Sequence, residues 1–298
     1  MRETREHHVR PTDHADTIPF GALTRGWLDR AVMAMTKSLP DTYAGLRLAI
    51  LLRRAVTMRL AYPDDALDVE RWGLRPRLHP RDNGCEKTLL FTPRMYKPKE
   101  LAALETDIAR ARAQGPPFTF VDIGANVGLF SLFVAARAGA QARILTIEPE
   151  QANLERLHFN IGANPGVPIK ALAKALSDEP DVVAVELNHR DRGGTHAKKL
   201  DQDGARRETM RVSSATLLQL LTDGAVDTVD VLKIDVEGLE DVILQPFFRD
   251  APQRLWPRLA IIEDSRASWP SDLMAAVQAR GYRLVALSHH TNLIMRRA

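Results

Sequence analysis

The sequence has very little cysteine and little net charge, and both shortages narrow the class of protein. Cys85 is the only cysteine among 298 residues. A single cysteine excludes an intramolecular disulfide framework and is typical of proteins from reducing compartments. The 41 Lys and Arg residues against 38 Asp and Glu leave a net charge of +3, which is too small to indicate a nucleic-acid partner.

Long apolar runs are also missing. The longest, such as residues 48–52, hold five residues, whereas a membrane-spanning helix needs about 20. The first 17 residues are polar and His-rich and lack the apolar core of a secretory signal. We therefore expect a frayed N-terminal tail, no transmembrane segment and a cytoplasmic location.

Residues 20–60 have the pattern of two helices separated at Pro40, with Asp41 as the N-cap of the second. The second helix, residues 46–60, places four arginines among Leu, Ile, Val and Met. Such a helix suits either a membrane surface or a partner, or it packs its apolar face on the adjacent domain. We favour packing.

After a mixed segment, residues 71–117, short apolar runs alternate with helical ones. The mixed segment ends in a helix over 98–113 and a Gly-Pro-Pro break. Expected strands are 118–123, 143–148, 182–188, 229–235, 258–263, 282–288 and 292–297. Expected helices are 129–138, 150–161, 214–222, one from 239, and 272–280. This alternation predicts an α/β fold with a mostly parallel sheet covered on both faces, closed by one antiparallel strand. The expected units are therefore 1–70, 71–117 and 118–298.

A possible ligand site lies where the first strand meets its helix. Asp122 is followed by Gly124, Asn126 and Gly128, and the helix begins at once. Glycine lets the backbone approach a ligand closely, and Asn tolerates a positive φ. The helix N-terminus offers free amides. The pattern is not the dinucleotide G-x-G-x-x-G, and Asp122 favours a ligand with a cationic group over a pyrophosphate.

The second strand ends at Glu148, followed by Pro149. An acidic side chain at this point can accept hydrogen bonds from both hydroxyls of a ribose. The alternative is an exposed strand-end carboxylate without a ligand.

Four segments carry a resemblance to a known family. They are FVDIGANVGLFSL (120–132), IEPEQANLERLHFN (147–160), ALSD (175–178) and VLKIDVEGLE (231–240). Over about residues 85–298 the chain resembles the FkbM-type methyltransferases. The resemblance implies a class I methyltransferase fold, with a Rossmann-like seven-stranded sheet, and S-adenosyl-L-methionine as cofactor. An N-terminal helical extension lies outside it.

The resemblance also implies contacts between the cofactor and three groups of residues. The amino acid part of the cofactor would be held by Asp122, Gly124, Asn126 and Gly128, and its ribose by Glu148. The adenine would lie near Ala175 and Leu176.

The reacting end is expected at Lys233-Ile-Asp-Val-Glu-Gly, at the carboxyl end of a later strand. Strand alternation places Asp235 and Glu237 on the same side as Lys233. The three charges either form ion pairs, or Asp235 lies beside the methyl group while Glu237 orients the acceptor hydroxyl.

Other candidates are less firmly placed by the pattern. His196, in a glycine-bearing loop, is a third possible base, and the alternative is a solvated loop histidine. Glu263 and Asn292 end later strands on the same edge. Asp235, Glu237 and Glu263 are possible Mg²⁺ ligands, but no motif fixes a metal, and none is expected.

The expected reaction is O-methylation of a hydroxyl on a small molecule or glycan. The alternatives are N-methylation, nucleic-acid methylation, a non-catalytic cofactor-binding protein and a nicotinamide-dependent enzyme. The sequence does not indicate an oligomeric state.

Overall fold

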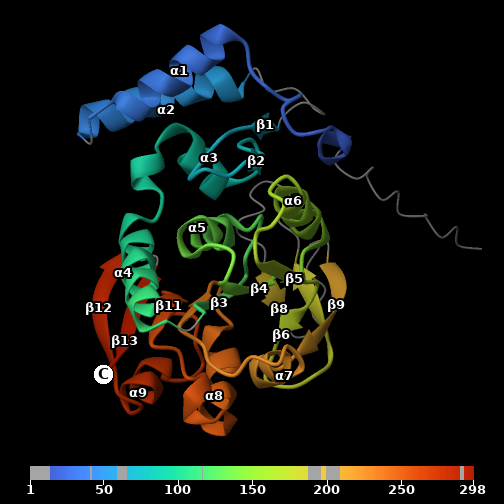
Figure 1. Cartoon of the computed structure of the whole chain (residues 1–298), viewed down its shortest axis with the longest axis vertical. Helices are drawn as coiled ribbons and strands as arrows, with labels where there is room; N and C mark the ends of the chain where they lie inside the picture. Colours follow the sequence, from blue (N-terminus) through green and yellow to red (C-terminus); the bar gives the residue numbers. More distant parts are fainter. Residues whose placement is uncertain are drawn as a thin grey trace, which may run out of the picture.

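The computed structural model describes residues 14–40, 42–58, 66–115, 117–186, 196–198, 209–288 and 292–298. Its centre is a seven-stranded sheet in the order β12-β13-β11-β10-β3-β4-β5 (Figure 1). In chain order these strands are β3 (Thr119–Ile123), β4 (Arg143–Ile147), β5 (Ile169–Leu172), β10 (Val231–Ile234), β11 (Leu259–Glu263), β12 (Tyr282–Ser288) and β13 (Asn292–Arg297).

The sheet is parallel except at one edge. Strand β13 pairs antiparallel with both β11 and β12, which confirms the predicted closing strand. The chain runs outward from β3 through β4 to β5 and then returns to β10 on the other side of β3. Ligands of open α/β sheets bind at such a switch point, beside the carboxyl ends of the strands.

Helices cover both faces of the sheet, as the continuous apolar strands require. Phe120, Ile144 and Val231 pack with α4 (Pro98–Gln114) and α5 (Leu129–Ala138) on one face. The next residues along the strands, such as Val121 and Leu232, belong to the core on the other face. That core is covered by α7 (Leu217–Asp223), α8 (Glu240–Asp250) and α9 (Leu273–Gln278). Helix α6 (Gln151–Gly162) lies beside α5 (Figure 1).

A second, four-stranded sheet was not predicted as a unit. It consists of β6 (Ala175–Leu176), β9 (Thr209–Ala215), β7 (Val182–Glu186) and β8 (His196–Lys198), in that order. The helix expected over 214–222 begins instead at Leu217, because Ser214 is the Cα partner of Ala175 in the β6–β9 pair. Thr216 caps α7 by accepting a hydrogen bond from the Gln219 N–H.

The N-terminal part forms a helical hairpin of α1 (Trp27–Ser38) and α2 (Tyr43–Thr57), as the sequence predicts. The predicted cap was wrong by one residue, because the Thr42 hydroxyl accepts from the Gly45 N–H. The hairpin lies across one end of the molecule, beyond α3 (Gly84–Phe91) (Figure 1). Between them lie β1 (Leu67–Asp68) and β2 (Arg77–Leu78), and η2 (Pro93–Met95) follows α3.

The expectation of a frayed tail fails for its last four residues. His14–Thr17 form a short 3₁₀ helix, η1, and the Ala15 carbonyl accepts a hydrogen bond from the buried Arg77 guanidinium. Two further histidines of this His-rich tail, His7 and His8, lie outside the described residues. A further 3₁₀ turn, η4 (Gln253–Leu255), precedes β11. None of the described helices is long and apolar enough to cross a membrane.

Candidate active site

The turn between β3 and α5 is held in an unusual backbone conformation. Gly124, Asn126 and Gly128 have φ values of 69°, 54° and 81°. The N–H groups of Gly124 and Ala125 both donate to the Ile147 carbonyl, at 3.0 and 3.1 Å, which ties the turn to the end of β4. A Cβ at Gly124 would collide with the backbone carbonyl of Asp235. The turn therefore requires glycine, and it brings the ends of β3, β4 and β10 together.

We expect Gly124→Ala to destabilise the protein by about 2–5 kcal/mol, from left-handed strain plus the collision with the Asp235 carbonyl. Gly166→Ala is a matched control, because Gly166 has φ +89° but nothing within 4 Å of a built Cβ. The control should show only the strain, about 1–2 kcal/mol. Urea denaturation of both variants measures the difference. Equal losses would contradict the close approach at Gly124.

Glu148 lies inside the protein, so its reading as an exposed strand-end carboxylate is wrong: only 4% of its surface is exposed. Its two oxygens accept hydrogen bonds from the N–H groups of Asn126 (2.7 Å) and Glu150 (3.0 Å). Burial raises the pKa of this carboxyl to about 7, although the hydrogen bonds from Glu150 and Asn126 oppose the shift. Each oxygen of an ionised carboxylate keeps a further lone pair for a ligand hydroxyl.

Lys233 connects the end of β3 with the end of β10. Its Nζ donates to the Gly124 carbonyl at 2.8 Å and lies 3.5 Å from carboxylate oxygens of both Asp122 and Asp235. Burial alone would lower the Lys233 pKa, but Asp235 and Asp122 outweigh it and hold that pKa above its usual range. The ion pair between Lys233 and Asp235 considered from the sequence is therefore present, and Asp122 extends it.

Asp122 has no exposed surface. The Ser131 hydroxyl donates to its Oδ2 at 2.7 Å. Burial raises the Asp122 pKa, while Lys233 and Ser131 oppose the shift. The Asp122 carboxylate is therefore buried below the turn and is not exposed at the surface of the site.

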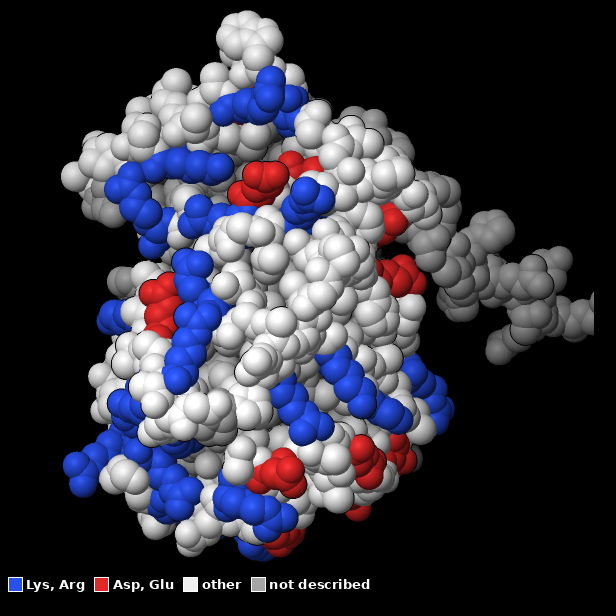
Figure 2. All heavy atoms as spheres, viewed as in Figure 1, with Lys and Arg blue, Asp and Glu red and all other residues white. Residues whose placement is uncertain are grey.

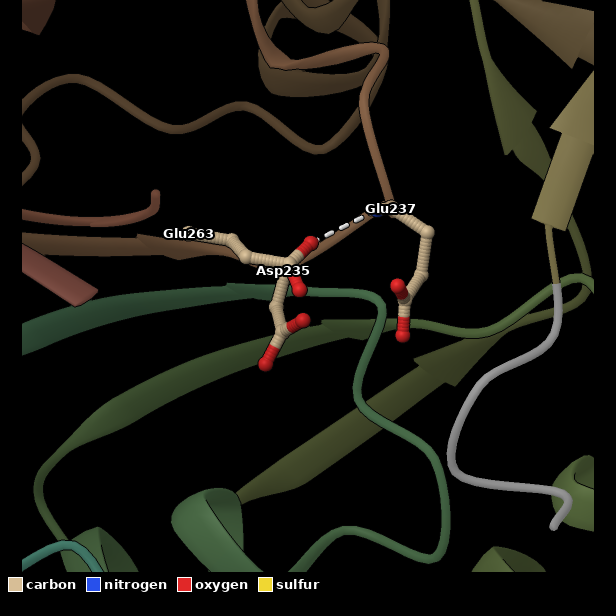
Figure 3. Close-up of side chains that lie close together, drawn as sticks. All are labelled: Asp235, Glu237 and Glu263. Atoms are coloured by element: carbon tan, nitrogen blue, oxygen red, sulfur yellow. Dashed lines mark hydrogen bonds between the residues drawn. The ribbon is translucent and has the colours of Figure 1, made fainter. Parts of the chain in front are cut away.

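Asp235, Glu237 and Glu263 form an acidic cluster at the ends of β10 and β11, in which one oxygen of each lies within 4.8 Å of the others. Figure 3 shows the carboxylates of Asp235 and Glu237 projecting on the same side of the chain. The Glu237 backbone, at φ 57°, turns its N–H to Glu263 Oε2 at 2.8 Å. Carboxylate oxygens within this distance of one another could hold a divalent cation.

Two members of this cluster differ in charge at neutral pH. Burial raises the Glu263 pKa to about 9, and the neighbouring Asp235 and Glu237 charges add to the shift. Burial would also raise the Asp235 pKa, but Lys233 and then Lys97 outweigh it and lower that pKa. Asp235 is therefore ionised at neutral pH, and Glu263 holds the proton.

The segment before β3 contributes residues to the site that the sequence did not reveal. Asn83, the N-cap of α3, donates from Nδ2 to Asn126 Oδ1 at 2.9 Å. Tyr96 is buried, and burial raises its pKa, with the charges of Cys85 and Asp122 adding to the shift. Neither Asn83 nor Tyr96 belongs to a recognisable motif.

The remaining candidates are placed as follows. Ala175 and Leu176 are buried in β6, where they pair with β9. His196 is in β8, opposite Glu186 of β7, and its side chain is outside the described part of the chain. Asn292 lies opposite Glu263 in register, but its amide donates to Glu100 of α4 at 2.6 Å. The Asn292 side chain is thus used inside the protein.

The strand order, with one antiparallel strand inserted at the edge of a parallel sheet, is that of the class I methyltransferase fold. A family model described as the methyltransferase FkbM domain matches residues 122–284, more than half of the chain. The chain belongs to this family, as the sequence segments indicated.

Two curated proteins show the range of relatives. AMB antimetabolite synthetase AmbE of Pseudomonas aeruginosa is 29% identical over 162 residues, which cover 43% of this chain but 8% of the synthetase. Methyltransferase sdnD of Sordaria araneosa is 28% identical over 213 residues, covering 55% of this chain and 81% of sdnD. Among solved structures, the METTL16 methyltransferase domain is 14% identical with a TM-score of 0.46, covering 96% of this chain and 88% of that one.

Proposed function

We propose that this methyltransferase uses S-adenosyl-L-methionine to methylate a hydroxyl group on a small molecule or a glycan. One arrangement supports the proposal most directly. The strained turn at Gly124–Gly128 and Glu148 lie at one side of the switch point, and the acidic cluster lies at the other, with Lys233 between them.

The turn fits the proposed cofactor in shape and charge. Gly124, Asn126 and Gly128 would hold the amino acid part with backbone groups, and Glu148 would accept from the ribose hydroxyls. Asp122 would add negative charge from below the turn, where its carboxylate is fully buried. Ala175 and Leu176 would border the adenine. When bound, the cofactor supplies a methyl group on a sulfonium, which is open to attack by a nucleophile.

The acidic cluster would prepare the acceptor. An alcohol is a weak nucleophile at neutral pH, so a base within hydrogen-bond reach of its proton assists the transfer. Glu237 would accept that hydrogen bond and take the proton, while ionised Asp235 places negative charge near the sulfonium. His196 is the alternative base. Much of the remaining rate would come from holding the reacting atoms in line.

Calorimetry tests the choice of cofactor. Titration with S-adenosylhomocysteine, the co-product, should give saturable binding, and titration with NAD should give none. Binding of NAD together with no binding of S-adenosylhomocysteine would overturn the proposal.

Cofactor affinity should depend on pH through Glu148. Its pKa of about 7 means that the free carboxyl holds a proton below that pH, whereas a ribose diol donates best to the ionised form. As the pH increases toward about 7, affinity for S-adenosylhomocysteine should therefore rise by up to tenfold per pH unit. Above about pH 7 the affinity should level off.

Glu148→Gln is the matched variant, since it cannot ionise. Its affinity should be lower at pH 8 and nearly independent of pH. Its stability should also fall, by about 1–3 kcal/mol, because a glutamine oxygen and amide cannot accept from both the Asn126 and Glu150 N–H groups. A parallel pH dependence in the wild type and the variant would assign the titration to another group.

A further inference from the structure

The α1–α2 hairpin carries an unusual amount of exposed apolar surface. Among the described residues, eleven large hydrophobic side chains are exposed, and seven belong to the hairpin and its last turn. These seven define the outer hairpin face: Trp27, Leu28, Met35, Tyr43, Leu48, Leu51 and Met58.

This surface is additional to the one that attaches the hairpin to the domain. Met33 and Val56 are buried and pack in one cluster with Leu89 of α3, as the sequence analysis expected for the hairpin. Leu51 and Met58, seven residues apart and thus on one side of α2, are 61% and 83% exposed. The hairpin is therefore apolar on two sides, and packing against the domain accounts for one of them.

The same segment is strongly basic. Residues 25–58 contain six Lys or Arg residues against two Asp, a net charge of +4 in a chain whose total is +3. Arg30, Lys37, Arg47 and Arg54 are exposed. Figure 2 shows several Lys and Arg side chains at this end of the molecule, with uncharged surface and a few acidic side chains between them.

We propose that the outer hairpin face docks the protein on a membrane surface rich in anionic phospholipid. Apolar side chains bordered by Arg and Lys are the combination by which helices lie in the interface of such membranes. Trp27 and Tyr43, 75% and 73% exposed at the starts of the two helices, have the amphipathic rings that favour this depth. Neither helix spans the bilayer, so the hairpin lies on the surface.

The charge of the hairpin favours an anionic membrane over a second copy of the chain as the partner of this face. Two hairpins brought together would place two segments of net charge +4 against each other, whereas an anionic surface neutralises this charge. An anionic membrane therefore satisfies both the apolar and the basic part of the face.

Vesicle flotation with the full chain tests the proposal. The wild type should float with phosphatidylcholine vesicles that contain phosphatidylglycerol and remain unbound with phosphatidylcholine alone. Arg47→Glu with Arg54→Glu should lower partitioning at least about 25-fold, since each cationic side chain near such a surface contributes about fivefold. Trp27→Ser with Leu51→Ser should abolish flotation.

Matched controls lie on β12 and η4. Leu284→Ser with Val285→Ser removes similarly exposed apolar side chains, and Arg254→Glu with Arg283→Glu reverses two exposed charges. Both pairs should float like the wild type, and circular dichroism should show that every variant is folded.

Three results would overturn the proposal: no flotation of the wild type with anionic vesicles, equal flotation with neutral ones, or equal losses in the control pairs. Sedimentation velocity gives a fourth. A concentration-dependent dimer that Leu51→Ser abolishes would assign the face to a second copy instead.

Discussion

Glu237→Gln should lower turnover about 100-fold or more, the usual scale for removing a general base, while cofactor affinity and melting temperature stay near the wild-type values. Glutamine keeps the size of the side chain and the backbone N–H that donates to Glu263. It removes the negative charge that would accept the acceptor's proton. A loss confined to turnover is therefore expected only if Glu237 takes part in the reaction.

Asp235→Asn should also reduce turnover, and it should differ from Glu237→Gln in two further measurements. Lys233 would lose one of its two carboxylate partners, so the melting temperature should fall. Affinity for S-adenosylhomocysteine should change less than turnover does, since that ligand lacks the positive sulfonium.

Turnover at saturating cofactor and acceptor, paired with melting curves of the same samples, checks both variants. Glu105→Gln is the control for loss of a carboxylate, because Glu105 is half exposed and pairs with Arg137 on the surface. Near-wild-type turnover in both site variants would move the base elsewhere, with His196 the next to replace.

Six of the seven strands of the central sheet could be predicted from sequence because they are short apolar runs. Strand β5 was not predicted, and the predicted strand 182–188 lies in the second sheet as β7. Helix 129–138 was predicted with the bounds that the structure gives, since glycine precedes and follows it. The strand β9 was missed because Ser213 and Ser214 interrupt its apolar pattern, and its partners lie far away in the chain. The helix α3 was not predicted, because only residues 98–113 of the mixed segment 71–117 were assigned to a helix.

The same contrast holds for the site. Asp122, Glu148 and Asp235 end neighbouring strands, and parallel pairing brings such ends to one edge of the sheet. Local sequence is therefore enough to predict that they gather. The contact between Asn83 and Asn126 joins residues 43 positions apart, and no local pattern encodes it. Local sequence also could not show that Glu148 accepts hydrogen bonds from two backbone N–H groups. These hydrogen bonds give Glu148 a structural role besides the proposed contact with the ribose.

Lys233→Met should destabilise the protein by about 3–5 kcal/mol at neutral pH, the scale for leaving a buried charge without its partner. The Lys233 side chain is 5% exposed, and its ammonium group faces both Asp122 and Asp235. Methionine fills the same volume but leaves the two carboxylates facing each other and the Gly124 carbonyl without its donor. Packing is conserved, so the loss reports on charge.

The pH dependence of this loss identifies its cause. Without Lys233, the Asp235 pKa rises above its unfolded-chain value and the Asp122 pKa, already raised by burial, rises further, so the folded state binds more protons. Stability then falls as pH rises, and Lys233→Met should be less destabilising at about pH 5 than at about pH 8. Adding Asp235→Asn should restore part of the stability at the higher pH.

Urea denaturation at both pH values measures these effects, with Lys99→Met as the control. Lys99 is exposed and donates to the Leu287 carbonyl, so its replacement should cost less than about 1 kcal/mol at either pH. If Lys233→Met cost no more than the control, the two aspartates would not depend on Lys233 for their charge. The Lys233 ammonium group links Asp122, below the β3–α5 turn, to Asp235 of the acidic cluster. A small loss would therefore mean that this link does not hold the turn and the acidic cluster together.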